Sequence, residues 1–518
     1  MTLSSARPTD PEIEDAAATA PASANIAEWL RGHAADLADH PAIRQGDVTL
    51  SYAALDAAAA RAAGLLVAHG IRAGDRVAVI IPNVVHFPIV YYAALRLGAI
   101  VVPMNPLLKA GEIAYTWRDS GAKVAVVFGM FAEEAAKAAA DTGTDVIVID
   151  PATFEAELGR QEPVTVVEPR SDDDTAVILY TSGTTGQPKG AELTHANLSS
   201  NVRTNVETLM TTAPGDVLFG GLPLFHVFGQ TCGLNSAVFA GACLTLLPKF
   251  DGEEALRIVE RDRVTVFLGV PTMYIALLHV PDPQRFDTSS LKICASGGAS
   301  LPVEVLHGIE KTFDVLLLEG YGLSETSPVA SFNHPDRPTK AGSIGVPVRG
   351  VEMRVVDAED HEVPDGEIGE IVIRGENVMK GYWGRPEATA EAIRDGWFHS
   401  GDLARRDEDG FFFIVDRKKD MIIRNGFNVY PREVEEVLYA HPDVVEAAVL
   451  GIPHPVHGEE IAALVTLRPG AAVTEDEIRD YVRDRIAAYK YPRVVRFGEL
   501  PKGPTGKILK RAIEIRES

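Results

Sequence analysis

The segment from Thr181 to Gly190 (TSGTTGQPKG) combines hydroxyl side chains, glycines and a lysine, directly after an apolar stretch that predicts a buried strand. Glycines let backbone N–H groups converge on an anion, and hydroxyls add further donors. The spacing differs from the GxxxxGK[ST] pattern of a Walker loop, so a P-loop NTPase is disfavoured. We predict a phosphate-gripping loop. Its candidate ligand residues are Thr181, Ser182, Gly183, Thr184, Thr185 and Lys189.

Two further glycine-containing segments follow strand-like stretches and offer surfaces to a flat ligand. In the segment 319–325 (EGYGLSE), the glycines permit close approach of the backbone, and Tyr321 offers a stacking face. The segment 296–302 (SGGASLP) has the same character, and it also fits a plain strand-to-helix turn capped by Ser300. The first segment is thus a candidate for contact with a flat ligand.

Four polar residues in other motifs have types suited to a nucleotide and an acid. Asp402 stands beside a glycine turn in WFHSGD, where a carboxylate can accept both hydroxyls of a ribose. Arg417 lies in the charged connector DRKKD, and Lys507 lies on the loop LPKGPTGKILK. His226 is surrounded by apolar residues in LPLFHVFG, a setting in which a histidine is more often a core residue than a catalyst.

Taken in order, these motifs resemble the signatures of the adenylate-forming (ANL) superfamily of acyl-CoA synthetases, adenylation domains and luciferases. The resemblance extends over about residues 25–515. It implies an acid–thiol ligase that makes an acyl-adenylate from a carboxylic acid and ATP with Mg²⁺. Coenzyme A then displaces AMP to form the thioester.

The resemblance implies how ATP and the metal ion are held. The segment 319–325 would hold adenine, Ser324 would meet the α-phosphate, and Glu325 would meet the metal. Threonine is more usual in the family where Ser324 stands, but the hydroxyl is kept. Asp402 and Arg417 would bind the ribose. The other nucleotide-binding positions that it implies are Gly298, Ala299, Glu319, Gly320, Tyr321 and Gly322.

Catalytic roles for Lys507 and His226, beside Ser324 and Glu325, also follow from the resemblance. A carboxylate that attacks an anionic α-phosphate meets charge repulsion, and a lysine that touches both groups offsets it in the transition state. Lys507 is the residue in that position. His226 would position the acid at the mouth of the acyl pocket rather than transfer a proton.

The resemblance further implies that a small C-terminal domain rotates between the two half-reactions. Lys419, in the charged connector, would be the hinge. Gly426 would then line the tunnel for the pantetheine arm, although a hairpin glycine with positive φ fits the same position.

Apolar strand-like stretches alternate with helix-like stretches through most of the chain, which predicts parallel α/β sheets covered on both faces. Short strands divided by turns predict a small β-barrel subdomain at about 345–415. An α+β pattern follows it. We therefore predict a disordered tail at 1–25, a large N-terminal domain at 26–418 and a small, mobile C-terminal domain at 419–518.

Composition restricts the partners of the protein. The chain has 518 residues and a formal net charge of −24, which disfavours nucleic acid and anionic lipid. The cysteines, Cys232, Cys243 and Cys294, have no metal-site spacing. The first residues lack the pattern of a signal peptide, and no integral membrane segment is expected. We expect a cytoplasmic monomer or homodimer, with peripheral membrane contact left open.

The acid is expected to be a medium- to long-chain fatty acid, because the residues expected to border the acyl pocket are mostly small and none could pair with an amino acid's amine. These residues are Phe228, Thr231, Gly233, Gly297, Gly298 and Gly320. Four alternatives stay open at this point: an aryl-acid CoA ligase, an acyl-AMP ligase that delivers to a carrier protein, a luciferase-type oxygenase and a non-catalytic nucleotide binder.

Overall fold

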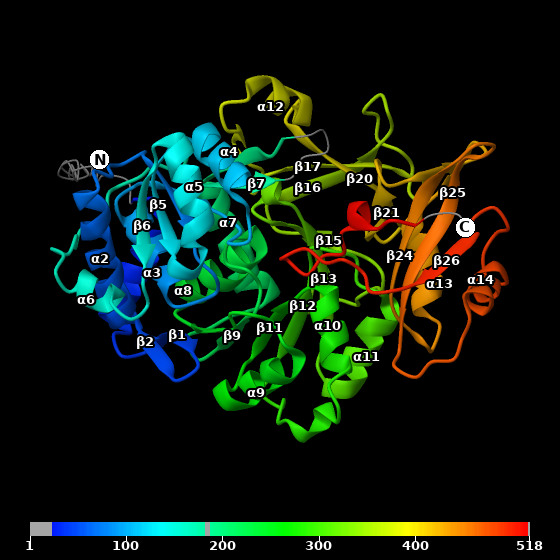
Figure 1. Ribbon diagram of the computed structural model, residues 1–518, viewed down its shortest axis with the longest axis horizontal. Coiled ribbons are helices and arrows are strands. Elements are labelled where there is room, and N and C mark those ends of the chain that lie inside the picture. The colour runs from blue at the N-terminus through cyan, green and yellow to red at the C-terminus, as the bar shows by residue number, and fades with distance from the viewer. Residues whose placement is uncertain (1–22, 182–186, 516–518) are drawn as a thin grey trace, which may run out of the picture.

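A seven-stranded mixed sheet contains the two strands, β7 and β8, that flank the predicted phosphate-gripping loop (Figure 1). The computed structural model describes residues 23–181 and 187–515. In spatial order the strands are β18 (Gly381–Tyr382), β8 (Lys189–Thr194), β7 (Thr175–Thr181), β4 (Ile100–Pro103), β3 (Arg76–Ile80), β5 (Ala122–Phe128) and β6 (Asp145–Ile149).

Two strands of this sheet run antiparallel to their neighbours. Strands β7, β4, β3, β5 and β6 are parallel, as predicted, but β8 pairs antiparallel with β7 and β18 pairs antiparallel with β8. Thr181 and Lys189 are direct cross-strand neighbours. The ladder therefore holds together the two described ends of the predicted phosphate-gripping loop.

A second, nine-stranded sheet carries the other glycine-containing segments. Its spatial order is β15 (Val346–Pro347), β14 (Val329–Phe332), β13 (Leu317–Gly322), β12 (Ile293–Ser296), β11 (Val266–Gly269), β9 (Val217–Gly220), β10 (Cys243–Leu246), β1 (Pro41–Gln45) and β2 (Val48–Ser51). The central strands from β13 to β1 are parallel. The segments 296–302 and 319–325 therefore leave the same edge of the sheet.

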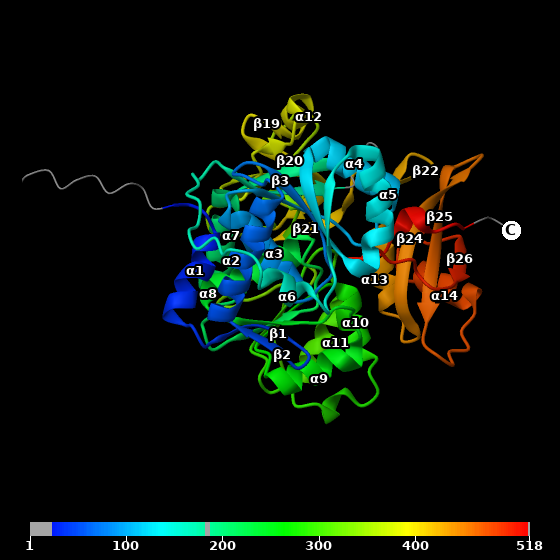
Figure 2. The ribbon, with the colours of Figure 1, turned by 60° about the vertical axis from the view of Figure 1, so that its left-hand side comes forward.

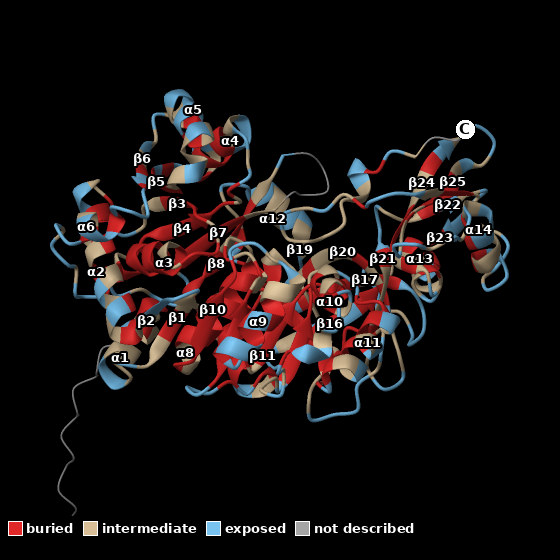
Figure 3. Cartoon of the chain, turned by 60° about the horizontal axis from the view of Figure 1, so that its bottom comes forward, coloured by how far each residue is buried: buried red, intermediate tan, exposed pale blue. Residues whose placement is uncertain are grey.

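Helices cover both sheets, and a helical layer lies between them. Helix α2 packs on β1 and β2, α3 packs on β3 and β4, and the two helices pack on each other. The α-helices of the large domain are α1 (Ala27–Asp36), α2 (Tyr52–Ala68), α3 (His86–Arg96), α4 (Ala110–Ser120), α5 (Ala132–Thr142), α6 (Phe154–Leu158), α7 (His195–Thr204), α8 (Ser236–Ala240), α9 (Gly252–Asp262), α10 (Pro271–Leu278), α11 (Val303–Phe313) and α12 (Pro386–Ala392). Figure 3 shows the buried residues concentrated in the strands and in the helix faces that cover them.

Short irregular helices complete the large domain. The π-helical turns are η2 (Asn205–Leu209) and η3 (Phe228–Asn235), and the 3-10 turns are η1 (Gly129–Phe131), η4 (Pro283–Arg285) and η5 (Ser324–Thr326). Among the described residues, no helix is both long enough and apolar enough to cross a membrane.

The β-rich segment forms an antiparallel half-barrel sheet. Its strands are β16 (Val351–Val356), β17 (Gly369–Gly375), β19 (Ile393–Arg394), β20 (Trp397–Arg406) and β21 (Phe412–Arg417). In the register of β20 and β21, Asp402 is the direct partner of Arg417. The pairing of β20 with β21 thereby places Asp402 beside Arg417.

The C-terminal unit has its own sheet and its own core. Its elements are β22 (Ile422–Arg424), β23 (Phe427–Val429), α13 (Pro431–Tyr439), β24 (Val444–His454), β25 (Gly458–Leu467), α14 (Glu475–Arg483), β26 (Val494–Phe497) and the 3-10 turn η6 (Lys510–Ala512). Pro431 starts α13, and Thr474 with Glu477 forms a capping box at the start of α14. Apolar residues of both helices pack on the sheet in a cluster separate from the main core. Figures 1 and 2 both place this unit at one end of the molecule.

Candidate active site

The structure brings Asp402, Arg417 and Tyr321 together where the half-barrel sheet meets the edge of the nine-stranded sheet. The Tyr321 hydroxyl donates to Asp402 Oδ2 at 2.6 Å, and Arg417 Nε lies 3.2 Å from Asp402 Oδ1. The Asp402 side chain is 7% exposed, whereas that of Arg417 is 50% exposed. A buried carboxylate with an exposed guanidinium beside it can bind the hydroxyls of a sugar at the surface of a cleft.

Glu325 joins the phosphate-gripping loop to the segment 319–325. It is buried on η5, and its Oε1 accepts from Thr181 Oγ1 at 3.3 Å and from the Tyr382 hydroxyl at 3.1 Å. Burial raises the pKa of Glu325. Ser324, next to it, is partly buried. Ser182, Gly183, Thr184 and Thr185 lie outside the described residues.

The oxygen atoms around Glu325 fit a magnesium ion. Mg²⁺ binds to carboxylate and hydroxyl oxygens together with phosphate oxygens. A bound cation also stabilises the charged form of a buried carboxylate, which has lost its contacts with water. Glu325 would hold the ion, and the hydroxyls of Thr181 and Ser324 are the neighbouring oxygen donors. The ion would neutralise negative charge on the phosphates.

Lys507 of the C-terminal unit lies near Arg417, Asp402 and Glu325. Figure 1 shows a red segment of this unit extending to the green strands. The Thr272 hydroxyl of α10 donates to Gly506 O at 2.9 Å and seats the loop. A Cβ added to Gly298 would lie 3.2 Å from Lys507 Cε. Burial first, and then the positive charge of Arg417, lower the pKa of Lys507 to about 8, although Asp402 and Glu325 act in the opposite direction.

His226 is held neutral beside Lys507. Its Nδ1 accepts from the backbone N–H of Phe228 at 3.3 Å. Burial, and then the positive charge of Lys507, lower the pKa of His226 to about 3. A neutral ring can hydrogen-bond to a carboxylate, but it is a poor proton carrier at pH 7. The geometry therefore supports positioning of the acid rather than proton transfer.

Glu319 has a structural role in the segment 296–302. Its side chain is buried, and Oε1 accepts from the backbone N–H of Leu301 at 3.0 Å, which fixes the segment 296–302 to β13. Burial raises the pKa of Glu319 to about 7, and Arg432 of α13 opposes this effect. The side chain thus supports a loop and faces the C-terminal unit.

Packing within the sheet also explains why the segment 319–325 has glycines. A Cβ added to Gly320 would overlap the ring of Phe332, and one added to Gly322 would overlap Pro328 O. Close packing of β14 against β13 therefore requires glycine at both positions, whether or not a ligand approaches. Gly298 has φ +80° and needs glycine for its conformation, and Ala299 beside it is exposed.

Lys419 and Gly426 lie in turns of the connector and the C-terminal unit. Lys419 is exposed between β21 and β22. Gly426, with φ +80°, forms the turn between β22 and β23, and a Cβ added there would meet no atom within 4 Å. In this arrangement the hairpin conformation accounts for the glycine.

The sequence analysis missed Tyr382 and Arg432. The Tyr382 ring lies 5.1 Å from Lys189 Nζ, and its hydroxyl contacts Glu325. Arg432 donates to Ile414 O at 2.9 Å and to Gly342 O at 3.3 Å, across the two units. Tyr382 stands in a Gly-Tyr-Trp run after strand-like sequence, but no local pattern indicates which residues these side chains reach.

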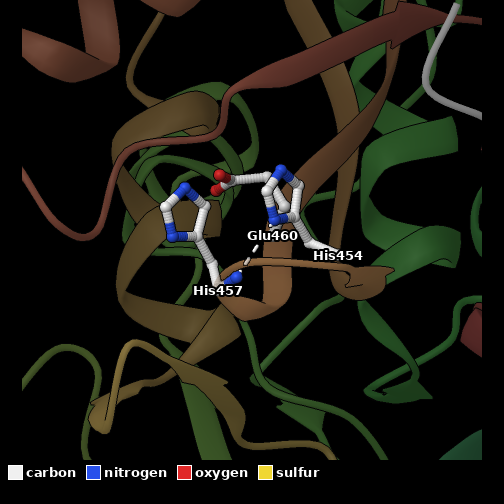
Figure 4. Close-up of side chains that lie close together, drawn as sticks. All are labelled: His454, His457 and Glu460. Carbon is white, nitrogen blue, oxygen red and sulfur yellow. Dashed lines mark hydrogen bonds between the residues drawn. The ribbon is translucent and has the colours of Figure 1, made fainter.

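A group of His454, His457 and Glu460 at the β24–β25 turn has metal-ligand types within 4.8 Å of one another (Figure 4). Both carboxylate oxygens of Glu460, however, accept from Arg424, at 2.7 and 3.0 Å. His454 Nδ1 accepts backbone N–H groups of the turn, including that of His457. The group therefore stabilises the turn and is not a preformed cation site.

Comparisons with known proteins agree with this geometry. The family model of the AMP-binding enzymes matches residues 30–383, and that of the AMP-binding enzyme C-terminal domain matches residues 433–507. A long-chain-fatty-acid–CoA ligase of Bacillus subtilis is 40% identical over 491 residues, covering 88% of each chain. A feruloyl-CoA synthase of an Amycolatopsis species is 42% identical over 482 residues, covering 92% of this chain and 95% of the relative.

Solved structures show the same architecture. The ATP-bound MatB of Rhodopseudomonas palustris is 36% identical, with a TM-score of 0.87, covering 94% of this chain and 98% of the other. The anthranilate CoA ligase AuaEII in complex with anthranoyl-AMP is 30% identical, with a TM-score of 0.89, covering 94% and 96%. The resemblance inferred from the motifs is confirmed: the protein belongs to the AMP-binding enzyme family of the adenylate-forming superfamily, as an acid–CoA ligase that uses ATP, Mg²⁺ and coenzyme A.

Proposed function

We propose that this ligase activates a medium- to long-chain fatty acid, forming the acyl-adenylate with release of pyrophosphate and then the acyl-CoA with release of AMP. The proposal rests on the uncharged, mostly small character of the residues expected to border the acyl pocket near His226. These residues are Phe228, Thr231, Gly233, Gly297, Gly298 and Gly320. A Cβ added to Gly233 would come no closer than 3.9 Å to Leu244 Cδ1, so this position has spare room. An elongated apolar tail suits such a surface.

In this proposal each residue of the site has a distinct task in adenylation. Lys507 offsets the repulsion between the acid and the α-phosphate, and Glu325 holds the magnesium ion. Asp402 and Arg417 bind the ribose, and neutral His226 orients the acid. No covalent enzyme intermediate is needed. The pyrophosphate leaves from the hairpin loop between Thr181 and Lys189.

An aryl acid is the second candidate, for two reasons. A relative of 42% identity is named a feruloyl-CoA synthase. In addition, Thr231 Oγ1 and Gln230 Oε1 are buried without a hydrogen-bond partner in this structure. A ring substituent that carries a hydroxyl group could satisfy such atoms, whereas an alkyl chain could not.

A coenzyme A-dependent AMP-release assay over aliphatic acids of increasing length, cinnamic and benzoic acids, and amino acids tests the proposal. We expect the highest kcat/KM for an aliphatic acid of about 8 to 16 carbons, because each buried methylene contributes about 0.8 kcal/mol. A higher kcat/KM for a hydroxylated aryl acid would replace this proposal with the second candidate. AMP release that coenzyme A does not stimulate would instead indicate delivery to another acceptor.

The Gly233→Val variant tests whether the acid lies along this surface. Its side chain would fill the spare room, so we expect the preferred acid to become shorter by several carbons while ATP binding is unchanged. Gly111→Val is the matched control, because Gly111 is exposed on α4 with no atom within 4 Å of an added Cβ. An unchanged chain-length profile in Gly233→Val would place the acid elsewhere.

A further inference from the structure

Tyr382 touches two parts of the adenylation site at once. Its hydroxyl donates to Glu325 Oε1 at 3.1 Å, and its ring centroid lies 5.1 Å from Lys189 Nζ. We propose that Tyr382 is a positioning residue that holds the carboxylate of Glu325 and the ammonium group of Lys189 in a fixed relation. A metal ion and a phosphate group that bind here would then meet a preformed pair of charges. This inference rests on the proposed roles of Glu325 and Lys189.

The backbone around Tyr382 is fixed to both partners. Tyr382 pairs with Ala191 in the register of β18 and β8, and Trp383 N donates to Gly190 O at 2.8 Å. On the other side, Met379 N donates to Glu325 O at 2.8 Å. Five consecutive residues, 379–383, therefore connect the main chain at Glu325 to the main chain beside Lys189. The side chain repeats the same connection.

The Tyr382 main chain is itself anchored, so the ring has a stable base. The Tyr382 backbone N–H donates to Thr389 Oγ1 at 2.9 Å, and the Arg385 backbone N–H donates to Tyr382 O at 3.0 Å. The Arg385 guanidinium pairs with Asp119 at 2.5 Å. These contacts hold the segment after β18 against α4 and α12.

A second group of side chains restrains the exit of the phosphate-gripping loop. The Tyr115 hydroxyl of α4 donates to Pro188 O at 2.8 Å, and the Tyr180 hydroxyl donates to Asp119 Oδ2 at 2.8 Å. These contacts act on the loop ends, whereas Tyr382 reaches the charged groups themselves. Removal of the Tyr382 hydroxyl should therefore leave the hairpin in place and release only the carboxylate.

Tyrosine suits this position because it orients both charges without neutralising either. A phenol donates to a carboxylate and leaves its negative charge available to a cation. An aromatic face attracts an ammonium group through its quadrupole and leaves its protons available to phosphate oxygens. A lysine or an aspartate in its place would cancel one of the two charges. The hydroxyl and the ring thus have separable effects.

Two substitutions separate these effects. Tyr382→Phe removes the hydrogen bond and keeps the ring, so we expect Mn²⁺, measured by electron paramagnetic resonance in the presence of ATP, to bind about tenfold more weakly. Metal-free ATP binding, measured by calorimetry, should be unchanged. Tyr382→Leu also removes the aromatic face, so metal-free ATP should bind about two- to fivefold more weakly as well.

Tyr481→Phe is the matched control, because the Tyr481 hydroxyl donates to Ala440 O within the C-terminal unit. It should change neither measurement. Wild-type Mn²⁺ and ATP affinities in both variants, with normal thermal unfolding, would overturn the inference. If Tyr382→Leu fails to fold, Tyr382→Phe alone decides. Failure of the wild-type protein to bind ATP with metal would contradict the proposed function itself, which is a different result.

Discussion

Lys507 is placed where its charge is both needed and easily lost. Its partly buried ammonium group lies near the positive Arg417 and near the negative Asp402 and Glu325. Burial and Arg417 prevail, so its pKa is about 8, below the ordinary lysine value of about 10.4. A lysine loses its positive charge as the pH rises through its pKa. The proposed charge compensation should therefore weaken in mildly alkaline solution.

We predict that kcat/KM for ATP in acyl-adenylate formation falls as the pH rises through about 8, because this parameter reports groups of the free enzyme. Arginine stays charged at alkaline pH. The Lys507→Arg variant should therefore be slower than the wild-type protein but should keep its rate beyond pH 9. Lys502→Arg is the control, since Lys502 pairs with Glu446 at 2.7 Å. If kcat/KM for ATP in Lys507→Arg falls at the same pH as in the wild-type protein, the titrating group is not Lys507.

The sequence predicted most of the single residues that meet in the site, but not how they do so. Asp402, Arg417, Glu325 and Lys507 were each recognisable from a local motif, and the structure brings them together. Tyr382 could not be found in this way, because both of its contacts join residues more than 50 positions apart. Glu319 was expected to be a nucleotide ligand, and the structure adds a contact that the motif did not indicate, from Leu301 N to Glu319 Oε1.

At the level of elements, the C-terminal unit is joined to the large domain by polar contacts and by Tyr439 and Val445, which pack at the edge of the main core. Thr272 bonds Gly506 O, and Arg432 bonds Gly342 O. The apolar core of the unit is separate from the main core. Such an arrangement permits the unit to move without exposing a core. We propose that it rotates about Lys419 so that Lys507 leaves before coenzyme A arrives.

We predict that Lys419→Pro slows thioester formation about tenfold more than acyl-adenylate formation, because a stiffer connector hinders rotation. Lys419 is exposed, and the hydrogen bonds of this turn are donated by Lys418, Asp420 and Met421, so local structure should survive. Lys419→Ala, which removes the side chain without stiffening the chain, is the control. Equal slowing of both half-reactions would reject the hinge. Separate assays of the two half-reactions provide the measurement.

The sequence did not predict whether neighbouring strands pair parallel or antiparallel. Apolar runs predicted β7 and β13 well, but a buried strand has the same pattern whether its neighbour is parallel or antiparallel. The antiparallel pairs β7–β8 and β13–β14 depend on contacts that are distant in the sequence. The half-barrel sheet was expected because its short strands are separated by recognisable turns.

At the scale of the whole molecule, positive side chains gather at the candidate site although the net charge of the protein is negative. The chain carries a net charge of −24, yet Lys189, Arg417 and Lys507 belong to one candidate site. Three units contribute to it: the phosphate-gripping loop comes from the seven-stranded sheet, the Asp402–Arg417 pair comes from the half-barrel sheet, and Lys507 comes from the C-terminal unit. In the proposed function this arrangement serves the first half-reaction, and Lys507 would have to withdraw for the second.

The most direct test of this account compares the two half-reactions in Lys507→Ala. Acyl-adenylate formation would be followed by pyrophosphate release, and thioester formation would be started from supplied acyl-AMP and coenzyme A. We predict a loss of at least about a hundredfold in the first and a change of less than about threefold in the second. An equal loss in both half-reactions would contradict the account.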